Sequence, residues 1–284
     1  MSNFRLPGTM DNVIYGFGYV GNAMYQTFTT EHNVLVIDPH SPTTPPRNPY
    51  CTVDGNAMCI FVAVPSPSNM DGECDDRIVR EVLTEIVRLR NSRYIPVCIK
   101  STLTPDKLIS IVTDYPELGI VYCPEFLRQD HAEDDFARQR SLVLGSSDVI
   151  ATKIVTDVYT HVFHKVLEIQ HVDIVTASLL KYATNSFLAA KVTFMNEMKA
   201  IMDRSDTDST WDDLAKLLSK DERIGKTHCA VPGPDGFEGW GGACFPKDTA
   251  ALIKYAQDLN TPITMVESAV KANVFHRLKG DNKS

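Results

Sequence analysis

The chain has 284 residues, which is enough for two domains of ordinary size. Apolar residues make up 43% and charged residues 23%, values typical of a globular protein and not of a disordered or membrane chain. The net charge of −8, with acidic and basic residues interspersed, argues against nucleic-acid binding. Because no apolar run is long enough to span a membrane and the first twelve residues lack the apolar core of a secretory signal, we expect a cytoplasmic protein.

The seven cysteines are an odd number and include no C-x-x-C pair, so we predict neither a disulfide framework nor a metal site. Cys59, Cys98 and Cys123 lie in apolar runs, where we interpret them as small buried hydrophobic side chains.

The first part of the chain alternates short apolar runs with helical stretches. The runs are NVIYGFG, VLVID, AMCIFVAV, IPVCIK, GIVYC, SLVLG and KVLEI. This alternation predicts an α/β fold, a doubly wound parallel sheet of the Rossmann type, over residues 1–170. One segment fits poorly, because residues 39–50 hold five prolines and a crossover helix cannot form there. We predict an irregular surface loop for this segment.

From His171 onward the strand pattern stops, and residues 171–284 are predicted to form an α-helical domain. Apolar residues recur at helical spacing over 172–203 without Pro or Gly, which predicts one long central helix. Shorter helices are expected around 211–218, 248–259 and 262–278. A loop rich in Gly and Pro, VPGPDGFEGWGG, separates the first two of these.

A glycine motif, G-F-G-Y-V-G, follows the first apolar strand and precedes a helix. Its glycines, Gly16, Gly18 and Gly21, permit a tight turn and a close approach of backbone N–H groups to a pyrophosphate. Asp38 ends the next strand, where a carboxylate accepts from a ribose 2′-hydroxyl and repels a 2′-phosphate. The pattern therefore predicts NAD as the cofactor, although a glycine turn with an unrelated Asp remains the alternative.

Cys244 lies in G-G-A-C-F-P-K-D, between the glycine-rich loop and a predicted helix. Pro246 suits a first helical turn, which places the thiol at the positive end of a helix dipole, where it ionises more easily. Asp248 follows one turn later. An inert structural cysteine is the alternative.

Lys181 and Asn185 are spaced i, i+4 on the long helix, so both project from one face. Together they are suited to stabilising an oxyanion. By spacing alone, a solvated helix face is the more common interpretation of such a pair.

Six motifs occur in the order found in the UDP-glucose 6-dehydrogenase family. They are G-F-G-Y-V-G, V-P-S-P with D-G-E-C-D, K-S-T, C-P-E-F-L-R, K-Y-A-T-N-S-F-L-A-A-K-V-T-F-M-N-E and G-G-A-C-F-P-K-D. The resemblance extends from Asn12 to about Asn273. It implies a Rossmann domain for NAD, a long helix that forms a homodimer, and oxidation of UDP-glucose to UDP-glucuronate with two NAD per turnover.

The resemblance also implies roles for the catalytic residues. Cys244 resembles the nucleophile that forms a thiohemiacetal and then a thioester, and Asp248 resembles the residue that acts on the alcohol proton through a water. Lys181 and Asn185 resemble the oxyanion-stabilising pair. Glu125 resembles the base for thioester hydrolysis, and Thr102 the hydroxyl that positions the catalytic water.

Binding roles follow from the same resemblance. The positions expected at the cofactor, besides the three glycines, Asp38 and Thr102, are Tyr19, Val20, Pro65 and Ser66. Those expected at the sugar donor, besides Glu125, Lys181 and Asn185, are Phe126, Leu127, Trp240 and Gly241. Arg223 resembles an arginine that reaches the substrate of the neighbouring subunit, which implies a homodimer. For Trp240, a packing aromatic is nearly as good an interpretation.

The sequence departs from the family pattern in several places, which include a longer loop between Arg223 and Cys244 and a shorter proline loop after Asp38. Gln129 replaces a second glutamate, Ser66 replaces a threonine, and the chain ends at Ser284, before the third, C-terminal domain of full-length members. Two alternatives to UDP-glucose oxidation therefore stay open. One is a related dehydrogenase acting on GDP-mannose or UDP-N-acetylmannosamine, and the other is a nucleotide-sugar or NAD-binding partner protein with little turnover.

Overall fold

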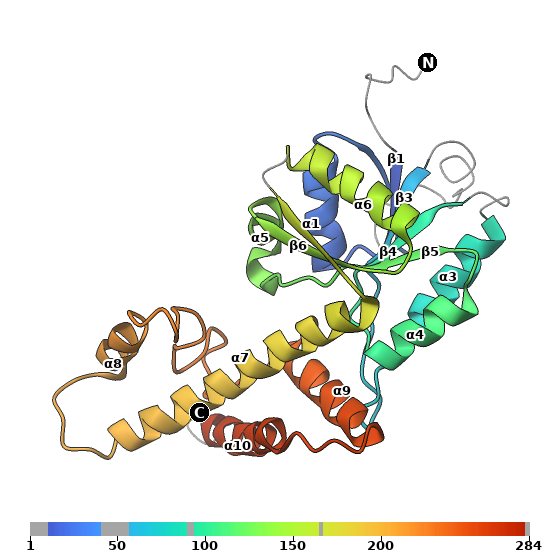
Figure 1. Ribbon diagram of the computed structural model, residues 1–284. Coiled ribbons are helices and arrows are strands. Elements are labelled where there is room, and N and C mark those ends of the chain that lie inside the picture. The colour runs from blue at the N-terminus through green and yellow to red at the C-terminus, as the bar shows by residue number, and fades with distance from the viewer. Residues whose placement is uncertain (1–10, 41–56, 90–93, 165–166, 282–284) are drawn as a thin grey trace. The chain divides into compact units, whose positions relative to one another are not determined.

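The computed structural model describes residues 11–40, 57–89, 94–164 and 167–281 (Figure 1). Contacts within the chain divide it into two compact units. Unit 1 comprises Met1–Pro67 and Cys74–Lys181, and unit 2 comprises Ser68–Glu73 and Tyr182–Ser284. Each unit is described by itself.

Unit 1 is built on a seven-stranded sheet with the order β2-β1-β3-β4-β5-β6-β7. Its neighbouring strands are parallel except β5 and β6, which are antiparallel. The strands are β1 (Asp11–Tyr15), β2 (Asn33–Ile37), β3 (Ala57–Val62), β4 (Pro96–Ile99), β5 (Gly119–Tyr122), β6 (Ser141–Gly145) and β7 (Glu168–Val172). The predicted Rossmann-type α/β fold is confirmed.

Helices cover both faces of this sheet. In Figure 1, α1 (Tyr19–Phe28), α5 (Ala132–Ala137) and α6 (Val149–Val162) lie on one face. The other face carries α3 (Arg77–Leu89) and α4 (Pro105–Asp114), and a short 3-10 turn, η1 (Gln129–His131), precedes α5. Because both faces are covered, β1, β4 and β5 are buried at every residue, which explains the continuous apolar sequences of β4 and β5.

Aromatic side chains fill the core between the sheet and the first of these helix layers. Phe28 of α1 makes edge or tilted contacts with Phe61, Phe136 and Tyr159, with ring centroids 5.2–5.8 Å apart. Such offset arrangements are the favoured geometries of aromatic pairs. This packing fixes the carboxyl ends of β1 and β3, between which the strand order reverses and ligands bind in folds of this type.

Unit 2 is helical. The long helix α7 (Ile174–Met202) begins in unit 1 and continues into unit 2, where α8 (Trp211–Leu218), α9 (Phe245–Asp258) and α10 (Thr264–Asp281) follow. A capping box of Thr210 and Asp213 starts α8. Within the described ranges, the helices are too short or too polar to cross a membrane.

The elements follow the sequence prediction closely. The long helix extends over Ile174–Met202, against a predicted range of 172–203, and α9 begins three residues earlier than predicted. The proline-rich segment 39–50, predicted as an irregular loop, lies mostly outside the described residues.

Candidate active site

The glycine loop after β1 has the geometry of a phosphate-binding turn. Gly16 has a φ of +94°, and a Cβ there would lie 2.5 Å from the carbonyl oxygen of Ala63. A Cβ at Gly21 would lie 2.0 Å from the carbonyl oxygen of Gly16, so both positions require glycine. A Cβ at Gly18 would meet no described atom within 4 Å. As far as the described residues show, no side chain caps α1, so its N-terminal N–H groups suit a pyrophosphate.

Asp38 lies beside this loop, at the end of β2. Its Oδ2 accepts a hydrogen bond from the backbone N–H of Phe17 at 2.6 Å, and its Oδ1 accepts from that of His40 at 2.7 Å. The carboxylate is therefore fixed next to the turn that would hold the pyrophosphate. This placement fits the ribose of a dinucleotide, because a carboxylate is a strong acceptor for a ribose hydroxyl.

Two serine hydroxyl groups form hydrogen bonds between the turn after β3 and the turn after β4. Ser66 Oγ donates to the carbonyl oxygen of Thr102 at 2.7 Å, and Ser101 Oγ donates to that of Val64 at 2.6 Å. Ser66 and Thr102 are buried, whereas Pro65 is exposed. Both turns lie at the carboxyl edge of the sheet, together with the glycine loop.

Lys181, on α7, is paired with the segment that follows β5. Its Nζ lies 2.9 Å from Oε1 of Glu125 and donates to the carbonyl oxygen of the same residue at 2.5 Å. Both side chains are buried. The second carboxylate oxygen accepts from the N–H of Leu127 at 2.7 Å, and Tyr19 OH, from the glycine motif, lies 3.5 Å from Oε1. Unit 1 thus joins the glycine motif, Glu125 and Lys181 in one polar cluster.

Phe126 lies next to this cluster with its side chain 46% exposed. Its ring centroid lies 5.4 Å from Nζ of Lys181, within the range of a cation–π contact.

Asn185, one turn after Lys181, is paired with α9. Its Nδ2 donates to Oδ2 of Asp248 at 2.5 Å, and Oδ1 of that carboxylate lies 2.5 Å from Nζ of Lys247. Asp248 is fully enclosed, whereas Lys247 is partly exposed. The two α7 positions predicted from the i, i+4 spacing therefore each contact a carboxylate. Lys181 does so in unit 1, and Asn185 does so in unit 2.

Cys244 is the residue immediately before α9, at the N-cap, and is partly exposed. Pro246 lies in the first turn of the helix, as predicted, and Asp248 donates its N–H to the carbonyl oxygen of Cys244 at 2.8 Å. The thiol thus lies at the N-terminal, positive end of a 14-residue helix.

The loop before Cys244 is held by three buried polar side chains. Asn273, on α10, accepts from the N–H of Trp240 at 2.7 Å and donates to its carbonyl oxygen at 2.9 Å. Asn196 accepts from the N–H of Gly239 at 2.9 Å, and Thr193 accepts from Nε1 of Trp240 at 2.9 Å. We call these three side chains the loop clamp. Trp240 is itself buried and packs against Phe245, so its indole serves as an anchor for the loop.

Gly241 follows the clamp in the chain. A Cβ at this position would lie 1.8 Å from Nη2 of Arg277, so any other residue here would displace the guanidinium that crosses the loop from α10. The same guanidinium pairs with Asp235 at 2.7 Å and lies 5.4 Å from the ring of Phe237.

Arg223 lies in the turn that follows α8. Its guanidinium is exposed and bonds to Asp221 at 2.6 Å. The turn that carries it is fixed by Lys191, whose Nζ donates to the carbonyl oxygens of Ile224 and Thr227 at 2.9 and 2.5 Å. Within this chain, Arg223 therefore points to solvent.

Sequence reasoning did not find the loop clamp, Lys191 or Lys247. Thr193 and Asn196 recur at i, i+3 within an otherwise apolar stretch of α7, and this polar interruption of a buried face was the available signal. For Asn273, on α10, no comparable signal exists in the sequence.

Comparisons with known proteins agree with this geometry. Residues 52–163 match the NAD binding domain of the UDP-glucose/GDP-mannose dehydrogenase family, and residues 175–274 match the central domain of the same family. The expected cofactor, NAD, is supported by the first match, although the glycine loop precedes the matched residues.

Relatives with similar sequences include the UDP-glucose 6-dehydrogenase of Rhizobium meliloti, 35% identical over 75% of this chain and 49% of that protein. The enzyme of the same name from Rickettsia felis is 32% identical over 77% of this chain and 48% of that protein. The chain thus spans about half the length of the curated relatives it matches.

Solved structures share the fold. A UDP-glucose dehydrogenase from Pyrobaculum islandicum superimposes with a TM-score of 0.80 at 24% identity, over 96% of this chain and 70% of that one. A 3-hydroxyisobutyrate dehydrogenase from Mycobacterium tuberculosis gives 0.71 at 16% identity, over 95% of both chains. Because two models of one family together match residues in both halves of the sequence, the chain belongs to the UDP-glucose/GDP-mannose dehydrogenase family.

Proposed function

We propose that this chain catalyses the NAD-dependent oxidation of UDP-glucose to UDP-glucuronate through a cysteine-bound intermediate. The observation that carries the proposal is the pairing on α7, where Lys181 and Asn185, one turn apart, are each held by a carboxylate. An ammonium and an amide fixed in this way are suited to an oxygen that becomes negatively charged during reaction. Unit 1 would bind the cofactor, and unit 2 would supply the nucleophile and most of the sugar site.

The first oxidation needs a base near the C6 hydroxyl and a cation near its oxygen. Asp248, oriented by Asn185 and Lys247, would take the proton through a bound water. Lys181 would stabilise the alkoxide. NAD, when bound, supplies the hydride acceptor for both oxidation steps.

The second oxidation uses the thiol of Cys244. Its thiolate would add to the aldehyde to form a thiohemiacetal, whose oxidation gives a thioester. Water activated by Glu125 and positioned by Thr102 would then release the carboxylate. The position of the thiol at the N-cap of α9 supports this role, because the helix dipole favours the thiolate both as attacking and as leaving group.

Substrate contacts beyond the reacting carbon are proposed for the segment Glu125–Leu127 and for the loop around Trp240 and Gly241. The loop clamp holds that loop rigidly, which supports a binding role for its backbone groups, while the indole of Trp240 packs inward. A fixed loop loses little conformational entropy when a ligand binds.

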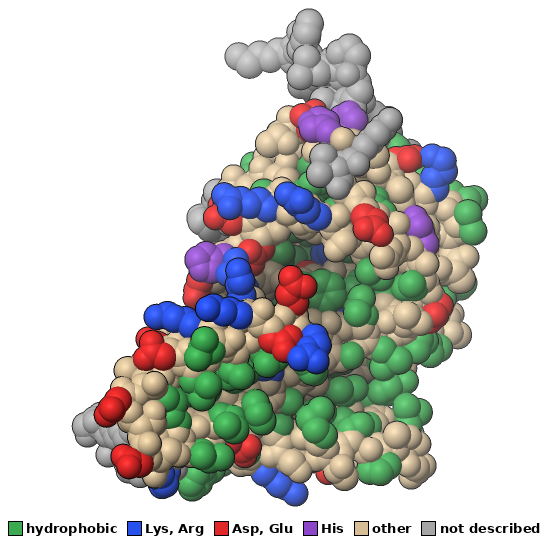
Figure 2. All heavy atoms as spheres, turned by 60° about the vertical axis from the view of Figure 1, so that its left-hand side comes forward, with side chains coloured by type: hydrophobic (Ala, Val, Ile, Leu, Met, Phe, Trp, Pro, Cys, Tyr) green, Lys and Arg blue, Asp and Glu red, His purple; other side chains and the backbone are tan. Residues whose placement is uncertain are grey.

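A homodimer is proposed from the surface of α7. Leu180, Phe187, Phe194 and Ile201 recur every seven residues and are 38%, 63%, 53% and 59% exposed. Apolar residues at this interval form the seam of paired helices. Figure 2 shows hydrophobic side chains gathered over the helical unit. An assembly of this kind would also give Arg223 a neighbouring subunit to reach. Phe194→Asp should produce monomers in light scattering, whereas the polar change Lys199→Glu, at a partly exposed position on the same helix, should not.

The proposed activity is tested with the purified chain, NAD and a panel of nucleotide sugars, followed by NADH absorbance. Two NADH per UDP-glucose, abolished by Cys244→Ala, are expected. Turnover of GDP-mannose or UDP-N-acetylmannosamine instead would assign a sister activity. Binding of NAD and sugar without any NADH would contradict the enzyme and favour a binding protein.

The covalent step has its own test. Cys244→Ser should stall after the second oxidation, because hydrolysis must expel an alkoxide, a poorer leaving group than a thiolate, and an ester should accumulate on the protein in mass spectra. Wild-type rates in this variant would contradict covalent catalysis.

A further inference from the structure

A buried lysine lies in the apolar core of unit 1. Lys100 follows β4 with only 3% of its surface exposed. Among the described residues, the one hydrogen bond donated by its ammonium goes to Sγ of Cys123, 3.0 Å away. Cys123 is 0% exposed, and the ring of Tyr159 lies 6.0 Å from the ammonium. Cys98 and Glu125 also act on this cation through space.

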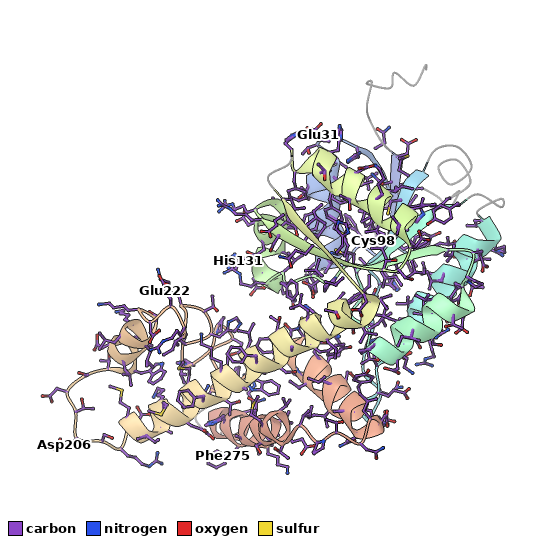
Figure 3. The ribbon with its side chains drawn as sticks, viewed as in Figure 1. Glu31, Cys98, His131, Asp206, Glu222 and Phe275 are labelled. Atoms are coloured by element: carbon purple, nitrogen blue, oxygen red, sulfur yellow. The ribbon has the colours of Figure 1, made fainter. Side chains whose placement is uncertain are left out.

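The sheet register explains why these groups meet. Cys98 pairs with Val121 and Ile99 with Tyr122 in the parallel ladder of β4 and β5, so the next pair along is Lys100 opposite Cys123. Side chains two residues apart on a strand share a face, and Cys98 therefore lies on the same side of the sheet. Cys98 is labelled within this sheet in Figure 3.

The charge of Lys100 requires a counter-charge. Burying an ammonium without an anion is unfavourable, because the charge loses its hydration. A neutral thiol is only a weak hydrogen-bond acceptor and does not replace that hydration. Groups facing the sulfur are Lys100, Cys98, Cys59 and the hydroxyl of Tyr159 at 3.9 Å, and Glu125 acts on Lys100 through space. No other cation is among them in the described core.

The protonation states follow from these neighbours. Burial raises the pKa of the Cys123 thiol, but the hydrogen bond from Cys98 and the charge of Lys100 outweigh it and lower that pKa to about 6. Burial raises the pKa of Cys98 well above its ordinary value. At neutral pH, Cys123 is therefore the thiolate of the group, and Cys98 remains a thiol.

We propose that Cys123 is an oxidation site, separate from Cys244, whose thiolate reacts with a peroxide and then becomes linked to Nζ of Lys100 as a sulfenamide. The link would join the chain directly after β4 to the chain directly after β5, next to Thr102 and Glu125. Burial restricts the oxidant to a small uncharged molecule, for which hydrogen peroxide is the simplest case.

The chemistry balances in two steps. The thiolate attacks one oxygen of hydrogen peroxide, the S–O bond forms, and the O–O bond breaks. The leaving hydroxide takes a proton from the ammonium, which gives a sulfenic acid, a neutral amine and one water. The amine then attacks the sulfur, the S–N bond forms, and a second water leaves. Sulfur is oxidised by two electrons, and the peroxide is reduced.

Lys100 becomes the resolving group because oxidation changes its charge. Once the thiolate is a neutral sulfenic acid, the buried ammonium has lost its anion, and burial then favours the neutral, nucleophilic amine. The nitrogen already lies 3.0 Å from the sulfur. A thiol reductant should reverse the link, as it does for other sulfenyl adducts.

Trypsin digestion of the full chain after hydrogen peroxide treatment tests the proposal by mass spectrometry. Unmodified protein gives the separate peptides 94–100, 101–107 and 108–128, and the last contains Cys123. A sulfenamide blocks cleavage at Lys100 and joins 94–107 to 108–128, with a mass two hydrogens below the sum of the two peptides. Dithiothreitol should abolish this species. A Cys98–Cys123 disulfide would instead join 94–100 to 108–128 with normal cleavage at Lys100, and would overturn the proposal.

Two variants provide matched controls. Cys98→Ala should still form the link, because the sulfur of Cys98 is not one of the two joined atoms, although the loss of its hydrogen bond to Cys123 should slow the reaction. Lys100→Arg keeps the cation but not the nucleophile, so Cys123 should stop at a sulfenic acid that dimedone traps. If the Arg variant does not fold, the wild-type and Cys98→Ala digests decide alone. A free, alkylatable Cys123 after complete oxidation of Cys244 would also overturn the proposal.

Discussion

Two neighbouring positions on α7 are supported in different ways. Lys181 rests on Glu125 in unit 1, and both partners of this ion pair are buried. Asn185 rests on Asp248 in unit 2, whose carboxylate has a second partner, the partly exposed Lys247. This difference indicates that the ion pair is lost when either Lys181 or Glu125 is replaced. The carboxylate of Asp248, in contrast, keeps one polar partner when either Asn185 or Lys247 is replaced. Buried charges that lose their only counter-ion are far more costly than neutral groups that lose one hydrogen bond.

The largest effect is expected at Lys181. Lys181→Met leaves the carboxylate of Glu125 buried without its ammonium, and should lower the free energy of unfolding by about 3–5 kcal/mol. The double variant Lys181→Met/Glu125→Gln should recover much of this stability in urea titrations without recovering NADH production. A single variant as stable as wild type would contradict the contrast between the two positions.

The second-largest effect on stability is expected at the loop clamp. Asn273→Leu leaves the N–H and the carbonyl oxygen of Trp240 buried without partners, so the free energy of unfolding should fall by roughly 2–4 kcal/mol. The variant should also change the alkylation rate of Cys244 by iodoacetamide. A change in stability with an unaltered alkylation rate would show that the clamp does not position the thiol.

A smaller loss of stability is expected at Asp248. Asp248→Asn keeps the size of the side chain and removes its charge, and Lys247 regains water because it is partly exposed. We expect a loss of about 1–3 kcal/mol in the free energy of unfolding. NADH production should fall far more than stability does. Lys247→Met should also lower the free energy of unfolding, by about 1–3 kcal/mol, because the buried carboxylate of Asp248 then keeps only the neutral amide of Asn185.

A change of stability with pH is expected from Cys123. The pKa of Cys123 is lowered to about 6, below its ordinary value near 9. Its contribution to stability is therefore complete above pH 9 and is lost as pH falls toward 6. The double variant Lys100→Met/Cys123→Ala removes both ionisable groups. Urea titrations at several pH values should show a steeper decline from pH 9 to pH 6 in the wild type than in this variant.

The fold was predictable because local patterns and global architecture agree. Apolar runs mark the strands, and the absence of Pro and Gly over α7 marks the long helix. The glycine loop and the proline in the first turn of α9 were predictable because each depends on backbone constraints of a few adjacent residues.

The partners of the site residues were not predictable in the same way. Asn185 and Asp248 are 63 residues apart, and Trp240 and Asn273 are 33 apart, so their contacts depend on how helices pack. Cys123 was interpreted as a small hydrophobic side chain. It is buried as expected, but its contact with Lys100 depends on the register of β4 and β5, which apolar runs alone do not specify.

The division of the chain between Lys181 and Tyr182 falls inside a continuous helix. Four residues of α-helix advance by about 6 Å along the axis, whatever surrounds them. The separation between Lys181 and Asn185 along the axis of α7 is thus set by the backbone hydrogen bonds of the helix. Substitutions that alter how either unit packs should leave this separation unchanged. Thr184→Pro should alter it, because proline removes a backbone hydrogen bond inside the helix.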